Sequence, residues 1–213
     1  MSTGGSSRQP AEHRRADVRP DGRRLRREQG RLATLDAAID LILAGVSPPT
    51  AEQVAAEAGV SVASVYRYFD TVDELRQACI WRYLERYHEL MAIPDIGHHD
   101  LTRRIENLVD ARLTFYETVE PVARFARREA SRSADMTATL QRVRATLSDQ
   151  IAQHFAVEFD RMETSVRLER LSVIAMLTSF EGWDQLAEVG LSRDSITRAW
   201  GTHLRVLLDP STG

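Results

Sequence analysis

Apolar side chains recur every three or four residues along most of this chain, which is the spacing of one face of an α-helix. Helical stretches are predicted over residues 28–44, 72–92, 100–118, 121–133, 136–158, 163–189 and 193–208. Residues typical of helix ends separate them, among them Gly45, Pro121, Asp135 and Gly190. The chain lacks the alternating pattern of a half-buried strand, so the sequence predicts an all-α fold.

The segment 50–69, TAEQVAAEAGVSVASVYRYF, predicts two short helices joined by a tight turn. Thr50 and Gln53 have the spacing of a capping box at the start of the first helix. Gly59 stands where the chain must turn, because glycine adopts a positive φ without steric cost. Ser61 can cap the second helix through its side-chain oxygen.

The second helix has an outward face suited to nucleic acid. Ala63 and Ser64 are small, so this face can approach another surface closely, and Val65 points to the core. Tyr66 and Arg67 supply hydroxyl and guanidinium donors for phosphate oxygens. This is the layout of a helix-turn-helix that places its second helix in the major groove of DNA.

Residues 31–75 resemble the DNA-binding domain of the tetracycline-repressor (TetR) family of bacterial transcriptional regulators. The resemblance rests above all on the run AGVS at 58–61 and the run YRYF at 66–69. The rest of the chain matches this family only in its length and in its predicted all-helical content. One position departs from the family pattern: Val72 stands where a phosphate-contacting Lys is common, which puts that single contact in doubt.

The resemblance implies an N-terminal three-helix DNA-binding domain and a C-terminal helical domain for ligand binding and dimerisation. The expected division is an Arg-rich disordered arm over 1–22, the helix-turn-helix domain over 23–72 and the effector domain over 73–213. Two readings of the basic stretches at 14–15 and 23–27 stay open: an arm that enters a minor groove, or a solvated tail.

The expected DNA contacts lie at the two helix starts and along the second helix. Base edges should meet small side chains, whereas the threonine and the tyrosines should meet phosphates. The arginine lies late in the helix and should meet a phosphate, with a guanine as the alternative. The expected set is Thr50, Ser61, Ala63, Ser64, Tyr66, Arg67 and Tyr68. Packing against the next helix is the alternative for Tyr68 and the expectation for Phe69.

The last two predicted helices are apolar over a wide arc, which indicates burial on two sides. In the family that this chain resembles, the corresponding pair forms a four-helix bundle with a second copy. A homodimer is therefore expected, and packing within one chain is the alternative.

The resemblance also implies a small-molecule effector among the central helices. Large residues there are candidates for ligand contact, and ordinary core packing is the alternative favoured for any single one of them. The candidate set is Trp81, Phe115, Tyr116, His154, Phe155, Met176, Phe180 and Trp183. The chemical class of the effector stays open, and so does its existence.

Charge is distributed unevenly along the 213 residues. The formal net charge is −3, yet residues 1–31 carry nine Arg and a net charge of +5. A basic end with an acidic remainder suits a protein that meets phosphates with one face. One cysteine, no signal-peptide pattern and no long apolar run together predict a cytoplasmic protein without a membrane segment.

The sequence offers no catalytic motif, and no cofactor is expected. His98 and His99 are adjacent in a loop, which does not make a metal site, so none is expected. We therefore expect a transcriptional repressor that binds a palindromic double-stranded operator as a homodimer and is released by a small-molecule effector. The alternatives are an activator, a ligand-independent DNA-binding protein, or a small-molecule-binding module without DNA function.

Overall fold

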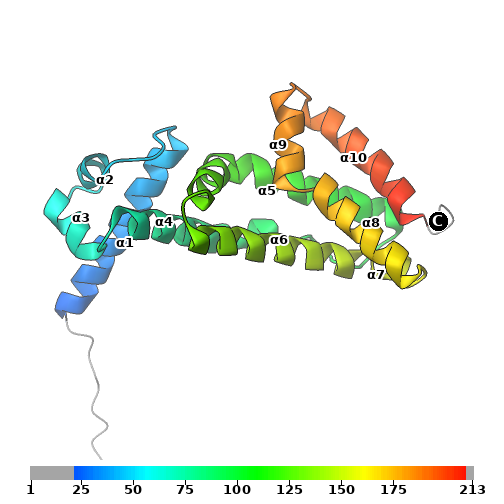
Figure 1. Ribbon diagram of the computed structural model, residues 1–213, viewed down its shortest axis with the longest axis horizontal. Coiled ribbons are helices and arrows are strands. Elements are labelled where there is room, and N and C mark those ends of the chain that lie inside the picture. The colour runs from blue at the N-terminus through cyan, green and yellow to red at the C-terminus, as the bar shows by residue number, and fades with distance from the viewer. Residues whose placement is uncertain (1–21, 210–213) are drawn as a thin grey trace, which may run out of the picture.

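The computed structural model describes residues 22–209, which are helical apart from short connections. Four helices form the N-terminal part: α1 (Gly22–Leu43), α2 (Ala51–Glu57), α3 (Val62–Tyr68) and α4 (Val72–Arg86). Figure 1 shows α1, α2 and α3 together at one end of an elongated molecule, with α4 leading away toward the remaining helices.

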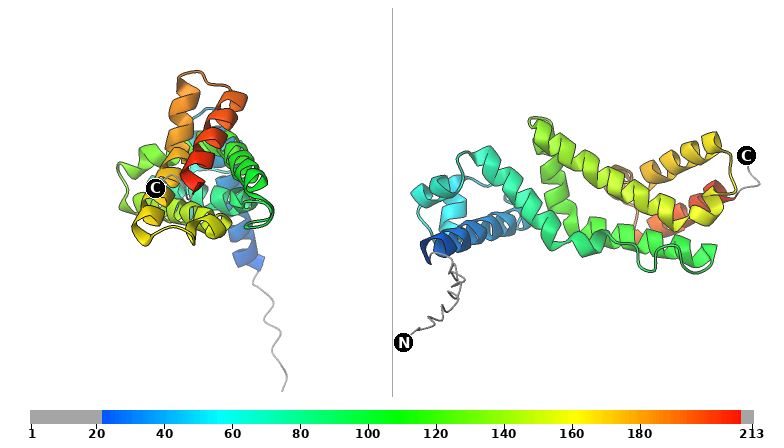
Figure 2. Two further views of the ribbon diagram at one scale, coloured as in Figure 1. Left: turned by 90° about the vertical axis from the view of Figure 1, so that its right-hand side faces the viewer. Right: turned by 90° about the horizontal axis from the view of Figure 1, so that it is seen from below.

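The remaining helices form the larger part of the molecule. After the 3-10 turn η1 (His88–Met91), the chain forms α5 (Leu101–Ala130), α6 (Ala134–His154), α7 (Ala156–Phe159), α8 (Thr164–Leu177), α9 (Phe180–Glu188) and α10 (Arg193–Leu208). The long helices α5 and α6 pack against each other, and α8 and α10 close the end far from α3 (Figures 1 and 2). The all-α fold expected from the sequence is confirmed.

A continuous apolar core runs through both parts. In the N-terminal part, Leu35 and Ile39 of α1 meet Val54 of α2, Val65 of α3 and Leu75 of α4, and each is nearly inaccessible to solvent. Burying side chains of this size contributes roughly 1.5–3 kcal/mol each. These contacts fix α3 relative to α1, so α3 cannot move independently of the helix that supports it.

The only cysteine, Cys79, lies inside this core. Its thiol is 2% exposed and lies 4.0 Å from the carbonyl oxygen of Leu35. Burial, with a smaller contribution from Asp36, raises the pKa of the Cys79 thiol to about 12. The thiol therefore stays protonated and packs as a small apolar group.

Two helix boundaries predicted in the N-terminal half are wrong. α1 begins at Gly22 rather than near residue 28, so the basic residues 23–27 are helical and do not belong to an arm. Arg, Leu, Gln and Glu are good helix formers, but their polar pattern carries no periodic apolar signal. α4 ends at Arg86 rather than near residue 92, and the tighter η1 follows it.

Pro121 was expected to separate two helices, but it lies inside the continuous helix α5. Proline removes one helical hydrogen bond and crowds the preceding turn. One backbone group in the turn before Pro121 has a partner outside the helix. The Tyr83 hydroxyl donates to the Thr118 carbonyl oxygen at 3.0 Å. Val119 and Val122 on either side are buried in the core, and this packing holds the helix together.

The helix predicted over 136–158 begins at Ala134 and ends at His154. The break has a specific cause. Arg104 Nη1 donates to the His154 carbonyl oxygen at 2.9 Å, and the backbone N–H of Glu158 turns to the Phe155 carbonyl instead. The i→i−4 backbone hydrogen bonds of α6 stop there, and the short α7 follows.

The helix predicted over 163–189 is two helices, α8 and α9, which meet at a corner. Ser179 caps α9 by accepting a hydrogen bond from the Gly182 N–H at 3.0 Å. The backbones approach so closely that a Cβ added at Gly182 would lie 2.7 Å from the Leu177 carbonyl oxygen. Only glycine permits this approach, so the corner depends on Gly182.

Candidate nucleic-acid interface and effector cavity

The helix-turn-helix has the local structure that its sequence predicts. Thr50 Oγ1 accepts from the Gln53 N–H at 3.3 Å, and Gln53 Oε1 accepts from the Thr50 N–H at 2.9 Å. Gly59 has a φ of +65°, which turns the chain between α2 and α3. Ser61 Oγ then accepts from the Ser64 N–H at 3.1 Å and begins α3. The predicted capping box, turn and cap are all confirmed.

The outward face of α3 is polar and accessible. Ser61, Ala63 and Arg67 are exposed and Ser64 is partly exposed. Arg67 Nη2 donates to Ser64 Oγ at 3.1 Å, and that oxygen lies 2.9 Å from Ser61 Oγ. Because Ser61, Ala63 and Ser64 have short side chains, the backbone of α3 can come close to a partner surface on this side. The buried side of the helix holds Val65.

The two tyrosines of α3 have different surroundings. Tyr66 is 50% exposed on the outward face. Tyr68 is half-buried against α1, where a Cβ added at Gly30 would lie 2.3 Å from its phenolic oxygen. Gly30 thus makes room for the Tyr68 ring, a pairing that nothing in the sequence indicated. Thr50, the remaining predicted contact, is exposed at the start of α2.

Basic side chains lie beside the end of α3. Arg24, Arg26 and Arg27, all in the first turns of α1, are exposed. Arg27 Nη2 donates to the Arg67 carbonyl oxygen at 3.2 Å, so α1 delivers positive charge to the same side of the molecule as Arg67. The predicted arm over 1–22 lies outside the described residues except for Gly22.

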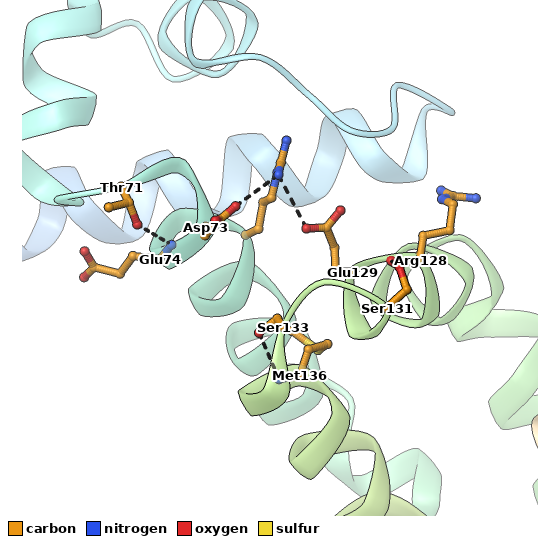
Figure 3. Close-up of polar contacts among 9 residues, drawn as sticks. Thr71, Asp73, Glu74, Arg128, Glu129, Ser131, Ser133 and Met136 are labelled. Carbon is orange, nitrogen blue, oxygen red and sulfur yellow. Dashed lines mark hydrogen bonds and ion pairs between the residues drawn. The ribbon is translucent and has the colours of Figure 1, made fainter.

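A polar junction connects the N-terminal helices to the rest of the molecule. Arg76 Nη1 of α4 lies 3.1 Å from Asp73 Oδ1 and 3.5 Å from Glu129 Oε2 of α5. Arg128 Nη2 donates to Ser47 Oγ, in the loop before α2, at 2.8 Å. Figure 3 shows dashed lines that join Asp73 at the start of α4 and Glu129 of α5 to one guanidinium between them. These contacts join α5 to α4 and to the loop before α2.

A cavity of about 570 Å³ lies between α4, α5, α6, α8 and α9. Its volume falls within the range of small-molecule sites, and such sites are mostly apolar with a few polar groups. The apolar wall includes Ile80, Leu84, Phe115, Val119, Val122, Ala126, Leu140, Leu147, Ile151 and Phe180.

The eight predicted ligand contacts divide evenly. Four of them line the cavity: Phe115, Tyr116, Met176 and Phe180. The Tyr116 hydroxyl donates to the Thr178 carbonyl oxygen at 2.8 Å. Burial raises the pKa of Tyr116 to about 12, so the phenol is neutral.

Two of the other four predicted contacts, Trp81 and Trp183, lie away from the cavity wall. Trp81 faces a shallow groove between α1 and α4, and the Arg142 guanidinium lies 5.1 Å from its ring. Trp183 is buried against Tyr116 and Phe180, behind the side chains that line the cavity.

His154 and Phe155 also lie away from the cavity, at the far end of α6. His154 Nδ1 accepts from the Gly97 N–H at 3.0 Å, and its Nε2 lies 2.9 Å from the Arg104 carbonyl oxygen. Burial, with smaller contributions from neighbouring arginines, lowers the pKa of His154. The ring is therefore neutral, carries its proton on Nε2, and serves as a brace between the 94–100 loop and α5.

Charged residues of the cavity wall were not predicted. Arg112, Arg127, Arg144 and Glu181 all line it. Arg112 is fully buried, and its desolvation lowers the pKa of the guanidinium. A signal was present in the sequence: Arg112 falls on the apolar stripe of α5, four residues after Leu108 and four before Tyr116.

Within residues 22–209, no group of three or more His, Cys, Asp and Glu side chains is placed to hold a metal ion. No helix in that part of the chain is both long and apolar enough to cross a bilayer.

Comparison with known proteins agrees with this geometry. Residues 35–79 match the family model of the bacterial regulatory proteins, tetR family, and this match spans α2, α3 and parts of α1 and α4. A TetR-family transcriptional regulator from Rhodococcus sp. is similar in fold, with a TM-score of 0.65 at 17% identity, over 85% of this chain and 100% of that chain. No curated protein matches significantly. The chain therefore carries a segment that matches the DNA-binding domain of the tetR family, on a fold shared with a TetR-family regulator.

Proposed function

We propose that the protein is a ligand-responsive transcriptional repressor that binds a palindromic operator as a homodimer and is released by a small molecule. The observation that carries this proposal is the polar outward face of α3, which lies beside the exposed arginines of α1. The cavity behind α4 and α5 supports the response to a ligand.

The seven predicted DNA contacts take two roles in this proposal. Ser61, Ala63 and Ser64 approach base edges, because they are short and lie at the start of α3. Phosphates are held by Thr50, Tyr66, Arg67 and, at the edge of the domain, Tyr68. The exposed arginines of α1 add attraction that does not depend on sequence.

The homodimer is proposed to form through α8 and α10. Leu168, Ser172 and Met176 are four residues apart on one stripe of α8, and all three are exposed. Val206 of α10 is 58% exposed, and α10 packs beside α8. Exposed apolar side chains on α8, beside the exposed Val206 of α10, fit pairing with a second copy across a twofold axis. The effector domain would then be residues 73–213, as the sequence suggested.

Release of DNA follows from the junction between the two parts. The two α3 helices of a dimer must be about 34–36 Å apart, one turn of DNA, to enter successive major grooves. A ligand that binds only conformers with another spacing lowers operator affinity by its differential affinity for the two states. The Arg76–Glu129 contact and the Arg128–Ser47 hydrogen bond link the cavity wall to the helix-turn-helix.

Selection from a random pool of duplex DNA tests this function, followed by transcription from a promoter that carries the recovered sequence. The expected result is an inverted repeat whose half-sites are one helical turn apart, with transcription that falls when protein is added. A Ser64→Ala/Tyr66→Ala variant is the matched control, because both side chains are at the surface of α3 and contribute little to the core. If the wild-type protein enriched no sequence over this variant, the proposal would be wrong.

A further inference from the structure

Two buried arginines of α5 differ in how their charge is neutralised. Arg104 is 4% exposed and forms an ion pair with Glu158, with 2.5 Å between Arg104 Nη2 and Glu158 Oε1. Arg112, two helical turns later, is 0% exposed. Its guanidinium donates to two backbone carbonyls and to the Gln150 amide oxygen, at distances of 2.9 to 3.2 Å. All three acceptors are neutral.

Arg112 therefore carries a buried charge without a counter-ion from residues 22–209. Each of the two arginines also leaves its Nε–H without an acceptor there, so the missing anion is what distinguishes Arg112. A guanidinium stays protonated in proteins. Burial of a charge is unfavourable unless an opposite charge is near. Arg112 lies in the wall of the cavity, so an anion bound against that wall can supply the opposite charge once the side chains that cover the guanidinium shift.

The rest of the cavity wall does not neutralise Arg112. Glu181 is the only carboxylate among the lining residues, and its Oε1 already accepts from Arg127 Nε at 3.0 Å and from Arg144 Nη2 at 2.5 Å. Three guanidiniums against one carboxylate leave the wall with a net charge of +2. A cation in the cavity would be repelled, and a neutral ligand would leave the charge of Arg112 uncompensated.

The remaining surface of the cavity selects for apolar material. Side chains such as Phe115, Val119, Leu140 and Phe180 make up most of the wall around these charges. Small inorganic anions would leave that apolar surface uncovered. A ligand that satisfies both features has an extended apolar body and one anionic end.

We propose that the cavity binds an amphipathic carboxylic acid whose carboxylate pairs with Arg112 and whose apolar chain lies between α5 and α6. The proposal rests on the effector role assigned to this cavity above, and gives the effector a chemical class.

Direct binding to the full-length protein, without DNA, tests the class. Isothermal titration calorimetry at neutral pH would compare dodecanoate, dodecanol and dodecyltrimethylammonium, each below its micelle concentration. These probes share one tail and differ in the charge of the head. Dodecanoate should bind about tenfold or more tightly than dodecanol, since only the carboxylate brings a charge opposite to that of Arg112, and the ammonium should bind weakest. Octanoate and hexadecanoate would then bracket the chain length.

Substitution of each buried arginine assigns the site. Arg112→Met keeps the length of the side chain and removes its charge, so the affinity for dodecanoate should fall to that for dodecanol. Arg104→Met is the matched control: it lowers the melting temperature, because Glu158 loses its partner, but it leaves the preference for the carboxylate intact. The head-group comparison on the wild-type protein decides the proposal even where Arg112→Met fails to fold.

Equal affinity for the three probes, tighter binding of the ammonium, or binding of none of the carboxylates would overturn the proposal. None of these results concerns the reading of DNA, which the selection experiment measures separately. Binding of dodecanoate that leaves operator affinity unchanged would support the ligand class and refute the effector role. Failure of the inference and failure of the proposed function are thus distinguishable.

Discussion

The outward face of α3 is held in place by contacts within the domain itself. Ser61 Oγ caps the helix by accepting from the Ser64 N–H. Arg67 Nη2 donates to Ser64 Oγ at 3.1 Å, and the Arg67 guanidinium lies beside the Tyr68 ring. Such side chains lose little conformational freedom when they meet DNA, because much of their ordering is already present. The same principle applies in the cavity, where Arg127 and Arg144 are fixed by Glu181.

Arg67 offers a test of the phosphate contacts. Arg67→Ala should weaken binding to every DNA sequence alike and reduce the slope of log affinity against log salt by about one unit. Fluorescence anisotropy over a series of salt concentrations measures both quantities. Arg103→Ala removes the same charge from an exposed position on the distant start of α5 and is the control. Equal slopes for the two variants would exclude a phosphate contact by Arg67.

Glu181 offers a test by pH. Burial raises its pKa, but hydrogen bonds from Arg144 and Arg127 outweigh this effect and lower the pKa from 4.5 to about 2. A carboxylate with a depressed pKa stabilises the folded state above its unfolded pKa and loses that contribution as pH falls. Wild type should therefore exceed Glu181→Gln in the free energy of unfolding near neutral pH by about 1 kcal/mol, a figure reduced for the partial exposure of the side chain.

This difference between wild type and Glu181→Gln should shrink as pH falls from about 4.5 to about 2. Urea unfolding at a series of pH values measures it. A difference that did not depend on pH would show that the two arginines do not stabilise the ionised form.

At the scale of elements, local signals predicted what depends on local structure. The capping box at Thr50, the turn at Gly59 and the cap at Ser61 involve residues a few positions apart, so the sequence alone was sufficient. Boundaries set by distant partners could not be predicted: the end of α6 depends on Arg104, fifty residues away. Pro121 was misread for the same reason, because tertiary packing holds α5 together across it.

The candidate sites also divide into features set by local sequence and features set by distant partners. All the predicted DNA contacts belong to one short motif, and apart from Tyr68 they lie at the surface that the motif implies. The cavity wall draws on five helices, so size and aromaticity identified only half of the predicted ligand contacts correctly as lining residues. Arg112 was missed because size and aromaticity select apolar and aromatic side chains and pass over a buried guanidinium. A charged residue on an apolar stripe is the better indicator of a polar group in a cavity.

The corner between α8 and α9 provides a test at this scale. Gly182→Ala should lower the free energy of unfolding by about 1–3 kcal/mol, because the added Cβ would lie 2.7 Å from one backbone oxygen and 3.0 Å from another. Gly201→Ala in α10 is the matched control: its Cβ would meet only Arg205 Nη1, at 3.6 Å. It should be neutral or stabilising by up to about 1 kcal/mol. Equal urea midpoints for the two variants would contradict this account of the corner.

At the scale of the whole molecule, the elongated shape separates three tasks. The helix-turn-helix lies at one end of the molecule, and α8 and α10 lie at the other (Figure 1). The cavity lies between α4, α5, α6, α8 and α9, and exposed apolar side chains lie on α8 and α10. A proposed dimer joined at that face would carry two α3 helices whose separation depends on the angle at the Arg76–Glu129 junction. In the proposed function, the exposed arginines of α1 that lie beside α3 attract DNA to this end of the molecule.

The dimer is tested by charge on its proposed face. Leu168→Glu combined with Val206→Glu should raise the dimer dissociation constant about a hundredfold or more. Each glutamate would place an unpaired carboxylate in the interface, and the twofold axis repeats each substitution in the second copy. Sedimentation equilibrium measures the constant. Leu43→Glu, a partly exposed position at the end of α1, is the control and should leave association unchanged. A monomeric wild-type protein, or a double variant that still dimerised, would refute this interface.

The central claim is that α3 reads DNA in a sequence-specific way. The most direct test is anisotropy of the purified protein on the selected inverted repeat and on a scrambled duplex of equal length, over a series of salt concentrations. The account predicts that the repeat is bound about a thousandfold or more tightly, with log affinity falling linearly with log salt on both duplexes. Equal affinity for the two duplexes, or binding that does not change with salt, would contradict it.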